Sequence, residues 1–272
     1  MAETQPEFLD VAGTAIAFRR QPGRQPGLVW LGGYKSDMLG TKAETLSAWA
    51  AANDRAFLRH DYAGHGESGG DFAQGTISSW LAQSLAVFRR FTEGSQILVG
   101  SSMGAWIALR MVQELRRQGE ERVAGLVLLA PAPDFTAELV EPKLTDAQRR
   151  DLAEKGYFEE PSEYSDQPYI YTRALIEDGR DNLVMTGPID THCPVHILQG
   201  LDDPQLVLRR DARVDRCIEH HAAQLIVAQL VQLDAGQGAL VGVHDAQLPG
   251  DGDRRHLVVA SDHHRADARL LS

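Results

Sequence analysis

The residues best suited to chemistry lie at positions 100–104, where the sequence is Gly-Ser-Ser-Met-Gly. An apolar run, residues 96–99, precedes this stretch, and a helical pattern extends from Met103 to about residue 118. A serine between such a strand and helix stands on a very sharp turn, with its Oγ clear of the sheet. The flanking glycines let the strand and the helix approach without a Cβ clash. The pattern predicts that Ser102 is a nucleophile and that the backbone N–H of Met103 faces a developing oxyanion.

Strands and helices alternate through the first half of the chain. Short apolar runs predict strands, and apolar residues at helical spacing predict the helices between them. The expected strands span 14–19, 27–31, 56–59, 96–99, 123–130 and 194–198, and the expected helices span 41–52, 77–91 and 103–118. This order favours an α/β fold with a mostly parallel central sheet and helices on both faces. Open sheets of this kind place their sites at the carboxyl ends of strands, where Ser102 falls.

Several loop motifs carry a resemblance to a known family. They are GGYKSDM at 32–38, DYAGHG at 61–66, GTI at 75–77 with Trp80, GSSMG at 100–104, and HCPV at 192–195 followed by QG at 199–200. With these motifs the chain resembles the α/β-hydrolase superfamily. Within it, the chain is similar to the branch of mitochondrial palmitoyl-protein thioesterases, which also cleave acyl glucuronides, and their bacterial relatives. The resemblance covers about residues 10–203 and implies a serine hydrolase that needs no metal and no organic cofactor.

The resemblance also implies roles for two further residues. In this fold the loop after the strand at 27–31 supplies the second oxyanion donor, which implies the backbone N–H of Tyr34. The acid follows a later strand, so Asp203 is the expected acid and Asp202 the second choice. His65 precedes Ser102, whereas the triad order of the fold is serine, acid, histidine. We therefore expect His65 to brace its glycine-rich loop, and we expect His192 and His196, beside and within the strand at 194–198, to be structural.

The histidine that completes the triad must follow Asp203, and two apolar runs lead into one. Residues 239–243 end at His244, and residues 257–260 lead to the sequence Ser-Asp-His-His-Arg at 261–265. The second resembles the Asp-His-Arg turn of the family, so His263 is the expected base, ahead of His264 and His244. Only nine residues follow His263, which is short for the closing helix of this fold.

Residues 134–188 interrupt the alternation of strands and helices. They contain no run typical of a buried strand, a possible capping box at 145–148, and tyrosines at 157, 164, 169 and 171. They carry thirteen acidic and six basic side chains. We expect an inserted helical lid at 134–188 on a hydrolase core formed by residues 1–133 and 189–272. The alternative is a helical packing layer far from the site.

Composition limits the function classes. The formal net charge of −11 argues against binding to nucleic acid or to an anionic membrane surface. No apolar run reaches the ~18 residues of a membrane span. The two cysteines show no C-x-x-C spacing, and the first residues lack signal-peptide features, so the predicted compartment is the cytoplasm. The sequence does not indicate an oligomeric state.

The resemblance stops after Asp203. Residues 204–272 contain no Lys, Phe, Trp or Tyr, yet they hold six of the ten histidines. This atypical tail has two explanations, a diverged segment or a reading-frame change in the gene. The expected function is cleavage of a thioester or carboxylic ester through an acyl-enzyme, as in acyl-protein thioesterases or acyl-glucuronide esterases. The substrate would be a small-molecule ester or an acylated protein or peptide. The alternatives are a hydrolase fold that lacks a placed catalytic histidine and only binds, and a carbon–carbon bond hydrolase with the same triad.

Overall fold

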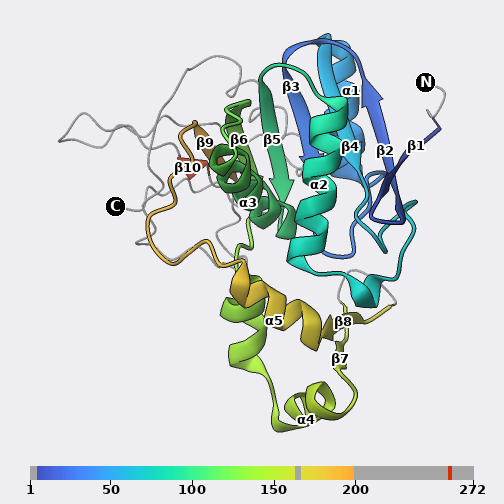
Figure 1. Cartoon of the computed structure of the whole chain (residues 1–272), viewed down its shortest axis with the longest axis vertical. Helices are drawn as coiled ribbons and strands as arrows, with labels where there is room; N and C mark the ends of the chain where they lie inside the picture. Colours follow the sequence, from blue (N-terminus) through green and yellow to red (C-terminus); the bar gives the residue numbers. More distant parts are fainter. Residues whose placement is uncertain (1–4, 163–166, 199–256, 259–272) are drawn as a thin grey trace, which may run out of the picture.

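The protein is built around one eight-stranded sheet (Figure 1). The computed structural model describes residues 5–162, 167–198 and 257–258. From β4 onward in the spatial order all strands are parallel, whereas β1 and β2 run antiparallel to their neighbours. The spatial order is β1 (Glu7–Val11), β2 (Thr14–Gln21), β4 (Arg55–His60), β3 (Arg24–Leu31), β5 (Gln96–Ser101), β6 (Val123–Leu129), β9 (Val195–Leu198) and β10 (Leu257–Val258). The predicted α/β fold class with a mostly parallel sheet is confirmed.

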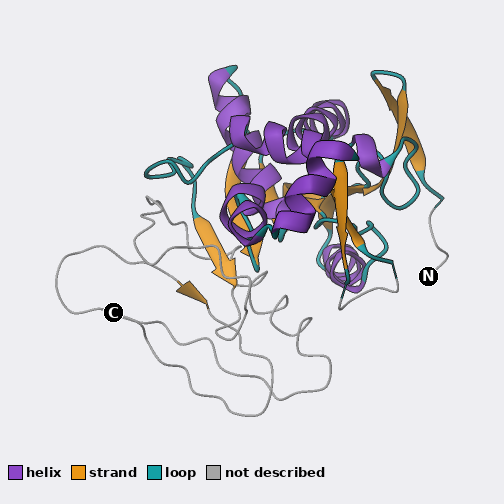
Figure 2. Cartoon of the chain, turned by 90° about the horizontal axis from the view of Figure 1, so that it is seen from below, coloured by secondary structure: helices purple, strands orange, loops and turns teal. Residues whose placement is uncertain are grey.

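Helices cover both faces of the sheet (Figures 1 and 2). On one face lie α2 (Ile77–Phe91) and α3 (Met103–Arg117), and on the other lies α1 (Thr41–Ala52). The predicted helix at 41–52 has the predicted bounds, and α2 begins with an N-cap, since the Thr76 hydroxyl accepts from the Ser79 N–H. These three helices thus cover both faces of the strands that lead to the candidate site.

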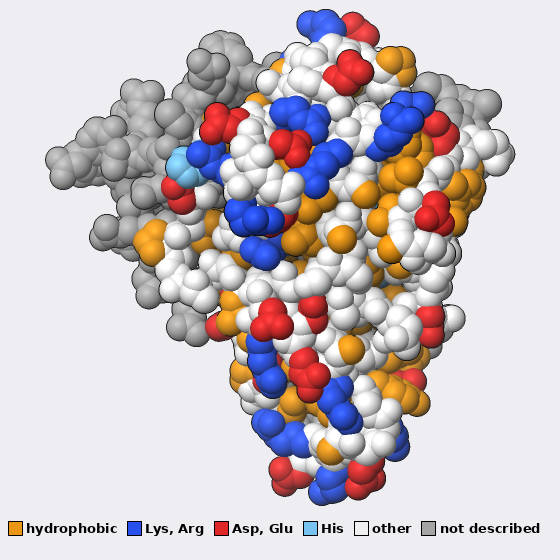
Figure 3. All heavy atoms as spheres, in the orientation of Figure 1, with side chains coloured by type: hydrophobic (Ala, Val, Ile, Leu, Met, Phe, Trp, Pro, Cys, Tyr) orange, Lys and Arg blue, Asp and Glu red, His pale blue; other side chains and the backbone are white. Residues whose placement is uncertain are grey.

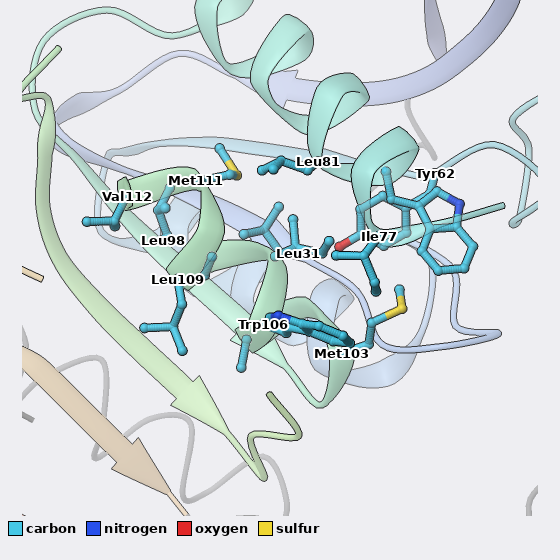
Figure 4. Packing of buried hydrophobic residues seen from close by; sticks show 14 of the residues in the cluster. Leu31, Tyr62, Ile77, Leu81, Leu98, Met103, Trp106, Leu109, Met111 and Val112 are labelled. Atoms are coloured by element: carbon cyan, nitrogen blue, oxygen red, sulfur yellow. The ribbon is translucent and has the colours of Figure 1, made fainter. Parts of the chain in front are cut away.

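The larger core cluster fills the space between the sheet, α2 and α3. Leu31 and Leu98 from the strands meet Met103 and Trp106 of α3 and Ile77 of α2 (Figure 4). All five side chains are at most 1% exposed. Burial on this scale contributes about 25 cal/mol per Å² of apolar surface, so the start of α3 is fixed firmly against the sheet.

The sequence did not predict the N-terminal strand β1. The first predicted strand, at 14–19, corresponds to β2. β1 is an edge strand with its side chains exposed or half-buried, so it lacks the apolar alternation of a core strand. β3 begins at Arg24, three residues before the strand predicted at 27–31.

The segment between β6 and β9 extends beyond the carboxyl ends of the parallel strands (Figure 1). It holds the π-helical turn η2 (Thr136–Val140), the 3₁₀ turn η3 (Glu141–Lys143), α4 (Asp146–Glu154), β7 (Tyr157–Glu160), β8 (Tyr169–Thr172) and α5 (Arg173–Asp181). The predicted capping box at Thr145 and Gln148 is present at the start of α4. β7 and β8 form a small antiparallel sheet that the sequence analysis did not predict, because this pair is separate from the core sheet.

One buried carboxylate holds the two ends of this insertion together. Asp134, in the left-handed region at φ 55°, accepts hydrogen bonds from the N–H of Val184 at 2.9 Å and of Met185 at 2.8 Å. Asp134 follows β6, and the two donors follow α5, so the segment leaves and rejoins the core at one point. A buried carboxylate needs such donors to offset its desolvation.

Candidate active site

Ser102 lies on a sharp turn between β5 and α3. Its backbone angles are φ 53° and ψ −118°, a left-handed conformation that costs a non-glycine residue roughly 1–3 kcal/mol. Three backbone hydrogen bonds hold it: the Ser102 N–H donates to Leu129, and the Ser102 carbonyl accepts from Ala105 and Ala132. This is the strained serine turn that the sequence spacing predicted. Such strain persists where the surroundings enforce it, and it is concentrated at functional sites.

The two glycines around Ser102 are required by space. A Cβ at Gly104 would lie 2.1 Å from the carbonyl oxygen of Leu31, and a Cβ at Gly100 would lie 2.5 Å from that of Gly104. Both contacts are with backbone atoms, which cannot move aside. Strand, turn and helix can therefore approach this closely only with glycine at both positions.

The loop after β3 packs directly against Ser102. A Cβ at Gly33 would lie 3.4 Å from the Cβ of Ser102. Among the described residues, the structure records no hydrogen-bond acceptor for the backbone N–H of Tyr34 or of Met103. Met103 is the first residue of α3, and the N–H groups in the first turn of a helix have no acceptor within that helix. Tyr34 follows Gly33 in this loop and Met103 follows Ser102, so their N–H groups stay the predicted oxyanion donors.

His65 binds the loop after β3 through Lys35, as predicted for a bracing residue. Its Nε2 accepts from the backbone N–H of Lys35 at 3.2 Å, so its Nδ1 carries the proton and donates to the carbonyl of Ala63 at 3.2 Å. Burial lowers the pKa of His65 to about 4. The imidazole is therefore neutral at pH 7 and can accept a hydrogen bond.

Asp61 is a second bracing residue, and the sequence analysis did not single it out. Its carboxylate accepts from the N–H of Met38 at 2.6 Å and from that of Glu67 at 2.9 Å. Burial raises its pKa, and these backbone donors act in the opposite direction. The sequence feature that could have indicated this role is the position of Asp61, the first residue of the glycine-rich loop directly after β4. A carboxylate buried there needs backbone N–H donors to offset its desolvation.

An aromatic cluster surrounds the side chain of Tyr34. Its ring is parallel to that of Tyr171, with centroids 5.6 Å apart, and lies 6.0 Å from Tyr169. Phe135 is 5.7 Å away and Phe72 5.0 Å away. Rings from the core and from the insertion therefore meet beside the loop that packs on Ser102. Of the other two tyrosines of the insertion, Tyr157 is exposed on β7 and Tyr164 lies outside the described residues.

The predicted acid and base are not among the described residues. Asp203 and Asp202, and likewise His263, His264 and His244, lie outside them. The structure does place the strand before His263, because β10 pairs in parallel with β9 through Leu257 opposite Ile197. The competing apolar run at 239–243 also lies outside the described residues.

Each histidine that the structure describes either contacts other residues or is buried in the core. Besides His65, His60 is buried with its Nε2 3.1 Å from the hydroxyl of Ser84, and burial lowers its pKa to about 4. The ring Nε2 of His192 contacts the carboxylate of Asp190, and His196 is buried within β9. Within the same residues, no group of His, Cys, Asp and Glu side chains is arranged for a metal ion. The absence of metal and cofactor stays a prediction.

The comparison with known families decides the classification. Residues 33–205, more than half of the chain, match the model of the α/β-hydrolase family described as serine aminopeptidase, S33. The protein is an α/β-hydrolase. The match of this α/β-hydrolase to its family model includes the loop after β3 and the Ser102 turn, and it ends where the atypical tail begins.

Curated relatives and solved structures agree with this classification. The α/β-hydrolase is 31% identical over 206 residues to the rat mitochondrial palmitoyl-protein thioesterase ABHD10, covering 75% of this chain and 68% of the relative. A crystal structure of a hydrolase from Agrobacterium vitis S4 is 44% identical, with a TM-score of 0.73 and coverage of 96% of this chain and 90% of that one. Mouse ABHD10 gives 29% identity and a TM-score of 0.65, covering 75% and 80%. The predicted resemblance is confirmed.

The sequence predicts that no segment spans a membrane and that the protein is cytoplasmic, and the structure bears on the first prediction alone. Within the described residues, no helix of this α/β-hydrolase has the length and apolar character needed to cross a bilayer. The rat and mouse relatives are named as mitochondrial proteins. The cytoplasmic assignment therefore stays a prediction.

Proposed function

We propose that the protein is a serine hydrolase that cleaves a thioester or a carboxylic ester through an acyl-enzyme. The observation that carries this proposal is the strained Ser102 turn, with Gly33 of the loop after β3 packed beside its side chain. A non-glycine residue in this strained conformation, with the predicted donors Tyr34 and Met103 beside it, suits attack on an acyl carbon better than any structural role.

The chemical steps follow from these groups. Ser102 Oγ attacks the acyl carbon while His263 takes its proton, and the N–H groups of Tyr34 and Met103 hold the resulting oxyanion. Losing one such donor typically costs ~3 kcal/mol in the transition state. Asp203 fixes the tautomer of His263 and stabilises its imidazolium. The leaving thiol or alcohol takes the proton, and water then hydrolyses the acyl-enzyme by the same route.

The assignment of His263 rests on topology. β9 and β10 run parallel to β5, so the chain leaves all three strands toward the edge that carries Ser102. Asp203 follows β9 and His263 follows β10, in the order serine, acid, histidine. The pairing of β10 with β9 favours His263, because the apolar run at 257–260 that leads to this histidine supplies a strand of the sheet.

The substrate class is inferred from the relatives and from the insertion. The names of the curated relatives favour an S-acylated protein or peptide, and a small-molecule ester such as an acyl glucuronide fits the same chemistry. We assign residues 134–188 as a lid over a core of residues 1–133 and 189–272. Its half-buried tyrosines Tyr169 and Tyr171 would contact the acyl group. Its excess of acidic side chains disfavours polyanionic leaving groups such as coenzyme A by repulsion.

Hydrolysis of an S-acylated peptide and of a p-nitrophenyl ester tests the proposal. Ser102→Ala should abolish both activities with the thermal midpoint within a few degrees of wild type. His263→Ala should do the same, whereas His244→Ala serves as the matched control and should remain active. A Ser102→Ala variant that keeps more than about a tenth of the wild-type kcat would contradict the assignment. Wild-type turnover no faster than that of Ser102→Ala would favour the binding protein, and cleavage of a β-diketone alone would favour the carbon–carbon bond hydrolase.

A further inference from the structure

Two side chains of the loop after β3 bind strand β8 of the insertion and the residue just before it. The hydroxyl of Tyr34 donates a hydrogen bond to the carbonyl oxygen of Ile170. The ammonium Nζ of Lys35 donates to the carbonyl oxygen of Pro168 over 2.8 Å. These partners lie 136 and 133 positions further along the chain. Neighbouring residues of one loop thus hold two carbonyls of one extended segment.

Ring packing strengthens this attachment. The ring of Tyr34 is parallel to that of Tyr171, with an interplanar angle of 1°, and lies 5.7 Å from Phe135 at the start of the insertion. Lys35 Nζ lies 5.7 Å from the centre of the Phe72 ring, which adds a cation–π contact on the core side. Burial raises the pKa of the Tyr34 hydroxyl, so that hydroxyl stays protonated and remains a donor.

The backbone of the same two residues serves the other side of the loop. No acceptor among the described residues binds the N–H of Tyr34, and a Cβ on the preceding Gly33 would lie 3.4 Å from the Cβ of Ser102. Lys35 adopts the left-handed region at φ 56°, where its N–H reaches Nε2 of His65. The side chains therefore bind the β8 segment, while the backbone of the same loop binds His65 and packs beside Ser102, so that a shift on one side displaces the other.

We propose that Tyr34 and Lys35 are positioning residues that couple the seating of β8 to the direction of the Tyr34 N–H. This inference rests on the proposed function, because it concerns the same oxyanion site. Two donors at adjacent positions fix both the location and the rotation of the loop against β8. Displacement of β8 by a poorly fitting acyl group would move the Tyr34 backbone and weaken the oxyanion site.

Tyr34→Phe is the sharpest variant, because it removes only the hydroxyl and keeps the ring and the backbone N–H. The control is Tyr157→Phe, which removes a hydroxyl from the partner strand β7, where the side chain is 41% exposed. The readouts are kcat and KM on a p-nitrophenyl ester, and the inhibition constant of a trifluoromethyl ketone, which binds a serine enzyme as an oxyanion. Tyr34→Phe should lower kcat about tenfold, leave KM within about twofold, and weaken the ketone by the same factor as kcat/KM. Tyr157→Phe should change none of these values by more than about twofold.

Hydrogen–deuterium exchange gives a readout that does not depend on turnover. Tyr34→Phe should speed amide exchange both in the peptide spanning residues 167–172 and in the one spanning residues 28–38, whereas Tyr157→Phe should leave the second peptide unchanged. Faster exchange in β8 alone, or wild-type kcat and ketone affinity in Tyr34→Phe, would overturn the coupling even if the thermal midpoint fell. Failure of the proposed function is distinct, since wild-type enzyme would then lack turnover and the exchange result alone would decide the coupling.

Discussion

The backbone N–H of Lys35 donates a hydrogen bond to Nε2 of His65 over 3.2 Å, and this bond requires a neutral imidazole. The pKa of His65 is lowered from 6.5 to about 4, chiefly by burial. Above pH 6.5 the folded and unfolded chains both hold neutral His65, and its contribution to stability is constant. Between pH 6.5 and pH 4 only the unfolded chain binds the proton, so the free energy of unfolding falls as the pH falls.

His65→Gln tests this pH dependence, because glutamine can accept a hydrogen bond but does not titrate. The His65 contribution should decrease by about 2 kcal/mol between pH 7 and pH 5. The stability difference between wild type and His65→Gln should shrink by that amount in denaturant unfolding at the two pH values. The comparison cancels the titration of His60, whose pKa is also about 4. Parallel pH profiles for the two proteins would show that His65 is not the responsible group.

The backbone of Ser102 makes a prediction about stability that is independent of catalysis. Glycine adopts φ 53° and ψ −118° without the strain that alanine has there. Ser102→Gly should therefore be more stable than Ser102→Ala by about 1 kcal/mol, the reverse of the usual order for these two residues. Urea unfolding of both variants measures the difference. An alanine variant that equals or exceeds the glycine variant in stability would mean that the turn is relaxed.

The close approach of α3 to the loop after β3 can be tested at Gly104. A Cβ there would lie 2.1 Å from the carbonyl oxygen of Leu31, so Gly104→Ala should destabilise the fold by about 3 kcal/mol or more. Gly187→Ala is the matched control, since a Cβ at Gly187 would meet no atom within 4 Å. Its stability should stay within about 0.5 kcal/mol of wild type in the same urea titration. Equal thermal midpoints for the two variants would contradict the close packing.

Acyl selection by the insertion predicts a chain-length profile. The value of kcat/KM for p-nitrophenyl esters should peak at one acyl length, because Tyr169 and Tyr171 offer a limited apolar surface beside Tyr34. Tyr171→Ala should flatten or shift this peak, whereas Tyr157→Phe should leave it in place. A profile that is flat in the wild type, or unchanged by Tyr171→Ala, would argue that residues 134–188 are a packing layer and not a selective lid.

Local signals in the sequence were sufficient for much of the fold. The glycine spacing around Ser102 and the capping box that begins at Thr145 each predicted a local geometry that the structure contains. Such features depend on a few consecutive residues, so their physics is visible in the sequence alone. β1 and the hairpin of β7 and β8 carry weaker signals, since neither pairs on both sides within the core sheet.

Contacts between residues far apart in the chain could not be predicted from the sequence. The hydrogen bond from Tyr34 to Ile170 joins positions 136 residues apart, and nothing near either residue specifies the other. The bracing role of Asp61 likewise depends on Met38, which approaches it only in the folded chain. The assignments of Asp203 and His263 rest on the order of strands, and the position of β10 favours the second of them.

Fluorophosphonate labelling followed by peptide mapping is the most direct test of the central claim, that Ser102 is an activated nucleophile. These reagents react with serines that have a general base and an oxyanion site, and they leave ordinary serines unmodified. The account predicts a single phosphonylated peptide that contains residues 100–104, with the modification on Ser102, and no labelling of Ser102→Ala. Unlabelled wild-type protein, under conditions that fully label a known serine hydrolase, or a label on another residue would contradict it.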